Sequence, residues 1–102
     1  MSKISSIHPG EILLEEFLKP LGITPYRLSK ETGVHQTRIG EIIKGVRSIS
    51  VATALRFARF FGNSPEFWMN LQNHFEIEEK RKLIRRELKN IKPLSAPADH
   101  VC

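Results

Sequence analysis

The strongest constraint on the fold is a repeated local pattern, in which a capping side chain and a proline precede a short apolar stretch and a glycine follows it. Thr24-Pro25 and Ser64-Pro65 each place a hydroxyl at a helix N-cap and a proline in the first turn. Glycines at positions 22, 33, 45 and 62 stand where such helices would end. The sequence has no alternating β-branched run and no Asn-Gly or Asp-Gly turn. An all-α fold is therefore expected.

Apolar spacing between these boundaries predicts six helices, over residues 9–19, 25–32, 36–44, 51–61, 65–73 and 78–91. The first five are expected to form one domain over residues 1–76. The sixth lies in a highly charged C-terminal segment, residues 77–92. Residues 93–102 contain two prolines and no apolar period, which predicts a disordered tail.

Length and composition exclude several classes of protein. The 102 residues suit a single domain, and the lone cysteine, Cys102, cannot form an intrachain disulfide. No stretch approaches the roughly 20 apolar residues of a membrane helix, so a cytoplasmic protein without membrane association is expected. The four histidines are scattered without metal-ligand spacing, and no glycine-rich phosphate loop or nucleophile–base pair occurs. No enzymatic activity, cofactor or metal is therefore expected.

The positive charge is concentrated in two parts of the chain. The net charge is +5 and the pI about 9.7. Residues 35–62 contain five basic residues and one acidic residue, and residues 77–92 contain seven basic and three acidic residues. An excess of this kind favours a polyanionic partner, and nucleic acid is the usual one.

Residues 24–45 have the order helix, glycine turn, helix, which is the helix-turn-helix pattern. Gly33 allows the sharp bend, and Leu28 and Ile42 are expected to anchor the two helices to the core. Val34 and Ile39 are expected to separate them. In this motif the second helix lies in the DNA major groove.

This segment resembles the helix-turn-helix of phage repressors (the Cro/C1 or XRE family). A narrower resemblance covers residues 7–76. His8-Pro9-Gly10-Glu11, Phe61-Gly62 and Ser64-Pro65-Glu66-Phe67-Trp68 followed by Leu71-Gln72 are similar to HigA-type (VapI-like) antitoxins. The resemblance implies an antitoxin that neutralises a RelE-like ribonuclease toxin from the same operon. It also implies repression of that operon by a homodimer bound to operator DNA.

The resemblance extends to individual positions of the second helix. Gln36 and Thr37 correspond to base-reading positions, and these side chains can contact adenine and the thymine methyl. Glu41, one turn later, also faces the groove, where a carboxylate repels phosphate but can accept from cytosine. Basic side chains near the helix ends are expected to neutralise phosphates. The complete set of candidate DNA-contacting residues is Thr24, His35, Gln36, Thr37, Arg38, Glu41, Lys44 and Arg47.

Two alternatives to the antitoxin reading remain at this point. One is a phage- or plasmid-type repressor without a toxin partner. The other is a toxin-masking interaction module with little DNA binding, because Pro25 replaces a phosphate-contacting glutamine of many relatives and Glu41 is acidic. Arg56 and Arg59 are interpreted as plain surface, and Trp68 as core or dimer packing. The charged C-terminal helix could dock on its own domain or contact a second subunit or a toxin.

Overall fold

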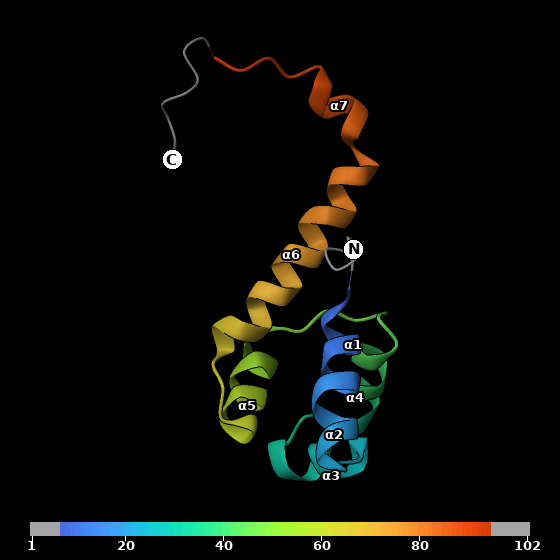
Figure 1. The fold of residues 1–102 in the computed structure, drawn as a ribbon, viewed down its shortest axis with the longest axis vertical. Helices are drawn as coiled ribbons and strands as arrows, with labels where there is room; N and C mark the ends of the chain where they lie inside the picture. The colour runs from blue at the N-terminus through green and yellow to red at the C-terminus, as the bar shows by residue number, and fades with distance from the viewer. Residues whose placement is uncertain (1–6, 95–102) are drawn as a thin grey trace.

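The computed structural model describes residues 7–94, and these contain helices and no strand (Figure 1). The elements are α1 (Pro9–Ile12), the π-helical segment η2 (Leu13–Leu18), α2 (Lys19–Leu21), α3 (Pro25–Thr32), α4 (Gln36–Ile43), α5 (Val51–Phe61), α6 (Pro65–Leu83) and α7 (Arg85–Lys89). The all-α prediction is confirmed. The predicted disorder of the tail falls almost wholly on residues 95–102, outside the described part.

Four helices begin at a residue whose side chain accepts a backbone N–H from the first turn. The capping residues of α1, α3, α5 and α6 are His8, Thr24, Ser50 and Ser64. Each satisfies a donor that has no partner within its own helix. The starts of these helices are therefore fixed by local sequence, as predicted.

The first helical stretch runs past its predicted end. Pro20 and Gly22 were expected to stop this helix; Gly22, whose φ is +67°, does end the stretch, but Pro20 lies within α2. The expectation was wrong because η2 makes a π-helical turn directly before α2. Pro20 directly follows this turn, in which the Lys19 N–H bonds the Leu14 carbonyl five residues earlier, and the helix continues through the proline.

The core lies where α5 and α6 pack against η2, α3 and α4. Trp68 and Phe57 are fully buried at its centre, with ring centroids 5.5 Å apart. Phe17 and Phe61 extend this aromatic cluster. The apolar spacing of residues 51–61 predicts that Ala54, Leu55, Ala58 and Phe61 face inward, but Leu55 is 54% exposed and Phe57 is buried instead. Apolar residues surround most of α5, so the inward face is set by contact with Trp68 rather than by periodicity.

The C-terminal half of the chain departs most from the sequence prediction. The expected break between residues 73 and 78 is absent, because α6 continues from Pro65 to Leu83. No proline or glycine interrupts this stretch, and a change from apolar to charged residues does not end a helix. The break falls instead at Ile84, with φ −110° and ψ 23°, and α7 ends at Lys89. The end of α6 and α7 extend away from the other helices (Figure 1).

Candidate nucleic-acid interface

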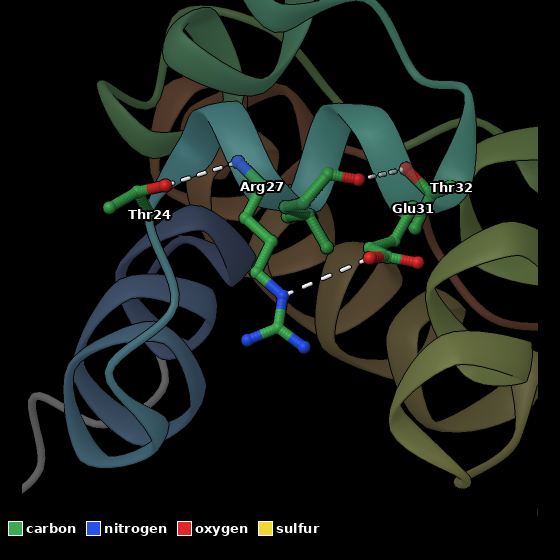
Figure 2. Close-up of polar contacts among 5 residues, drawn as sticks. Thr24, Arg27, Glu31 and Thr32 are labelled. Carbon is green, nitrogen blue, oxygen red and sulfur yellow. Dashed lines mark hydrogen bonds and ion pairs between the residues drawn. The ribbon is translucent and has the colours of Figure 1, made fainter.

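The turn between α3 and α4 is held by hydrogen bonds to Thr32. Its Oγ1 donates to the Leu28 carbonyl (2.6 Å) and accepts from the Val34 N–H (3.2 Å). Gly33 follows with φ +82°, a left-handed conformation that strains other residues. Figure 2 shows the Thr32 bond together with the Thr24 cap at the opposite end of α3. The turn therefore has a defined geometry, which sets the direction of α4.

Arg56 of α5 adds a long-range bond to this turn. Its Nη1 donates to the Thr32 carbonyl at 2.7 Å. Gly33 is required here for its positive φ, and a Cβ at this position would lie 2.7 Å from the same Nη1, so a side chain would also displace the end of the guanidinium. The sequence interpretation of Arg56 as plain surface missed this role. No local pattern around Arg56 indicates it, since Thr32 lies 24 residues earlier in the chain.

The outward face of α4 carries the predicted base-reading residues. Gln36, Thr37 and Arg38 are exposed, whereas Ile39 and Ile42 are fully buried on the opposite side. This division agrees with the expectation that the second helix presents polar side chains outward. Their contact with DNA stays a prediction.

The remaining candidate residues lie around the two ends of the motif. His35 is the exposed N-cap of α4, and its side chain makes no capping hydrogen bond. Lys44 is the exposed C-cap. Thr24 is also exposed, but its Oγ1 accepts from the Arg27 N–H at 3.1 Å. Thr24 thus has a structural role at the start of α3 whether or not it meets DNA.

Glu41 and Arg47 form an ion pair beside the exposed face of α4. Arg47 Nε and Glu41 Oε1 are 2.6 Å apart, and the side chains are 47% and 37% exposed. The pair offsets the negative charge of Glu41 where DNA phosphates would approach. The Arg47 guanidinium has N–H donors other than Nε that can bind a phosphate.

Buried contacts from α1 and α6 hold α4 and the loop after it. Gly10 packs on the backbone of Ile42 with no room for a side chain. Gln72 Oε1 accepts from the buried Ile49 N–H at 2.8 Å, and Gln72 Nε2 donates to Glu76 Oε2 at 2.8 Å. Ser48 Oγ donates to the same carboxylate oxygen at 3.1 Å. Residues of the motifs that carry the family resemblance therefore hold α4 and the loop after it on their buried side.

His8 joins α1 to α6 in this supporting region. Its Nδ1 accepts from the Gly10 N–H at 2.8 Å, and its ring lies edge-on to Phe75 with centroids 4.9 Å apart. Burial lowers the pKa of His8, and the negative charge of Glu76 opposes this shift. The neutral imidazole is thus the form that fits the fold.

Residues 7–94 offer neither a cluster of metal ligands nor a membrane-spanning helix. No group of three or more His, Cys, Asp or Glu side chains there is placed to hold a metal ion. None of the helices in this part of the chain has the length and apolar character to cross a membrane.

Comparisons with known proteins agree with this geometry. A helix-turn-helix family model matches residues 14–68. Virulence-associated protein I of Dichelobacter nodosus is 38% identical over 100 residues, covering 98% of this chain and 92% of that protein. Antitoxin HigA-1 of Vibrio cholerae is 36% identical over 93 residues, covering 91% and 88%.

This chain is also similar to a solved HigA structure. Pseudomonas aeruginosa antitoxin HigA with the higBA promoter superposes with a TM-score of 0.84 at 36% identity, over 87% of this chain and 98% of that one. The matched family and its HigA members are DNA-binding regulators and antitoxins, not enzymes. The chain therefore belongs to the XRE-type helix-turn-helix family, within its group of HigA-like antitoxins.

Proposed function

We propose that this protein is the antitoxin of a toxin–antitoxin pair, and that it represses its own operon by binding operator DNA through α4. The observation that carries the DNA-binding part is the exposed polar face of α4 on a turn fixed by Thr32, Gly33 and Arg56. The HigA structure with its promoter supports operator DNA as the ligand. In this proposal Gln36 and Thr37 read bases, while Arg38, Lys44 and Arg47 neutralise phosphates.

A homodimer is the proposed binding form. α4 has eight residues and is about 12 Å long, so one copy reaches only part of a major groove. Two copies on half-sites about 34 Å apart would supply the buried area and phosphate contacts that specific binding needs. Light scattering on the free protein and on its operator complex tests this directly. A single chain in both would contradict it.

The proposed toxin is a RelE-like ribonuclease made from the same operon. The support is membership of the HigA-like group, whose Vibrio cholerae member is named an antitoxin. Coexpression of this chain with the adjacent small reading frame should relieve growth arrest caused by that frame alone. The two products should also purify together. If the neighbour is harmless and does not bind, the chain acts as a repressor without a toxin.

Operator binding is tested with a fluorescent duplex of the chain's own promoter, and a shuffled duplex serves as control. We expect binding to the promoter to be at least about 1,000-fold tighter than to the shuffled sequence. Gln36→Ala should reduce this ratio, and Lys44→Ala should weaken both complexes alike. Equal affinity for the two duplexes in the wild-type protein would leave only the toxin-masking function.

A further inference from the structure

A positively charged surface pocket lies between the start of α4 and the first turns of α5. Its volume is about 310 Å³. The lining residues are Gly33, Val34, His35, Arg38, Ala52, Thr53 and Arg56. Two arginines and a histidine therefore share one pocket, and no carboxylate lines it. Among residues 7–94, neither arginine is in an ion pair with an acidic side chain.

Arg56 is held in place before any ligand arrives. Nη1 is fixed by the Thr32 carbonyl at 2.7 Å, and Gly33 leaves the space that the guanidinium occupies. A guanidinium has five donors, so four remain for another acceptor. Arg38, from the first turn of α4, lies on the other side of the pocket, is exposed, and has no hydrogen-bond or ion-pair partner among residues 7–94. A guanidinium held in place beside a second one without a partner suits a tetrahedral oxyanion with several acceptor oxygens.

We propose that this pocket binds one DNA backbone phosphate, with Arg56 as its anchor and Arg38 closing over it. The inference rests on the proposed operator binding, because Gln36 and Thr37, the base-reading residues of that function, stand in the chain between the lining residues His35 and Arg38. Arg56 then has two roles. It fixes the turn that directs α4, and it holds the adjacent phosphate. The position of α4 in the major groove therefore depends on the phosphate of the neighbouring DNA strand.

The test compares two variants of the same helix. Arg56→Gln and Arg59→Gln each remove one positive charge from α5 at an exposed position, but only Arg56 lines this pocket. Operator affinity is measured between about 50 and 200 mM salt. For Arg56→Gln the slope of log affinity against log salt should fall by about 0.9, the value of one phosphate. At low salt its affinity should fall about tenfold. For Arg59→Gln the slope should stay at the wild-type value.

A third variant separates the charge from the turn. Arg56→Lys keeps a cation in the pocket but loses the fork, so it should keep the wild-type salt slope while unfolding at a lower temperature. If Arg56→Gln keeps the full slope, or Arg59→Gln loses as much, the pocket does not bind a backbone phosphate.

Inorganic phosphate provides a test that needs neither DNA nor a folded variant. Titrated into the wild-type protein, it should shift the amide signals of Gly33, Arg38 and Arg56 saturably and leave that of Lys44 unmoved. No shift, or an equal shift at all four, would overturn the inference. This result is independent of the proposed function, whose failure would appear as a wild-type protein that does not prefer its own promoter.

Discussion

Gly10 of α1 packs directly on the backbone of Ile42 in α4, so closely that a Cβ at position 10 would overlap the Ile42 carbonyl oxygen. Gly10 is buried, and its N–H is accepted by His8 Nδ1. Pro9 completes the first turn beside it. The opening motif therefore brings two helix backbones together without intervening side chains, and it places α4 relative to the core.

This contact predicts opposite outcomes for two glycines that both lie in helices. Gly10→Ala should destabilise the protein by about 3 kcal/mol or more, because two backbones cannot separate without opening the core. Gly40→Ala should stabilise it by about 0.5–1 kcal/mol, because nothing lies within 4 Å of the added carbon and alanine favours a helix. Urea unfolding measures both. A Gly10→Ala protein as stable as wild type would contradict the packing.

How far the sequence predicts this fold depends on whether the interaction is local. The caps at Thr24, Ser50 and Ser64 were predictable because each side chain bonds a residue three positions later. The inward turn of Phe57 in place of Leu55 was not, because distant packing chooses between two apolar faces. The continuity of α6 past residue 73 was not predicted, because a change from apolar to charged residues does not by itself fix where a helix ends.

The same distinction applies to the candidate site. The exposed face of α4 follows from the spacing of Ile39 and Ile42, so the positions of Gln36 and Thr37 were predictable. The bond of Arg56 to Thr32 and the pairing of Glu41 with Arg47 join residues whose relation depends on loop paths. No periodicity encodes those paths, and these contacts decide how charge is arranged around α4.

The Glu41–Arg47 pair predicts coupled effects on DNA affinity. Arg47→Ala should weaken binding to a random duplex about tenfold, because it removes a cation and leaves the Glu41 carboxylate uncompensated near phosphates. Glu41→Gln should tighten that binding about threefold. If the two effects were independent, the double variant would bind about threefold more weakly than wild type. We expect a smaller loss, because removing the Glu41 charge helps most when Arg47 is absent. Fluorescence anisotropy measures the affinity of all four proteins.

A matched control comes from a second ion pair. Glu31 pairs with Arg27 on α3, with 3.9 Å between Arg27 Nε and Glu31 Oε2 (Figure 2). Glu31→Gln changes the net charge as Glu41→Gln does, but should alter random-duplex affinity much less. Additive single effects at positions 41 and 47 would show that the two side chains act independently. Stability should change by less than about 1 kcal/mol in every case, because both pairs are largely exposed.

His8 predicts a loss of stability in mild acid. Its pKa in the fold lies below the ordinary value of 6.5, because burial outweighs the opposing effect of Glu76. The unfolded chain therefore binds more protons near this pH. The contribution of neutral His8 to the free energy of unfolding is complete above pH 6.5. It falls as the pH drops below that value toward the pKa of His8 in the fold. Protonation also removes the acceptor that Nδ1 offers to the Gly10 N–H.

His8→Asn isolates this effect, because asparagine can still cap α1 but does not titrate. The urea midpoint of the wild-type protein should fall more between about pH 7.5 and 5 than that of the variant. The comparison concerns the change with pH alone, since the variant also loses the ring contact with Phe75. Parallel pH profiles would mean that His8 titrates alike in the folded and unfolded chains.

The projecting end of α6 and α7 should contribute little to the stability of the domain. Every buried side chain among residues 7–94 lies between Pro9 and Gln72, whereas Leu83 is 74% exposed and Leu88 43%. Deleting residues 81–102 keeps one helical turn beyond Glu76. Glu76 therefore stays within the helix and keeps its hydrogen bonds to Ser48 and Gln72. We expect the free energy of unfolding to change by less than about 0.5 kcal/mol.

The same truncated protein tests whether the exposed apolar side chains of this segment contact a partner. If they meet a second subunit, the mass measured by light scattering should halve while operator affinity falls. If they meet the toxin, the mass should stay the same while copurification with the toxin is lost. A truncated chain that retains both its mass and its toxin would show that this segment is no partner surface. A large loss of stability would instead show that the segment packs on its own domain.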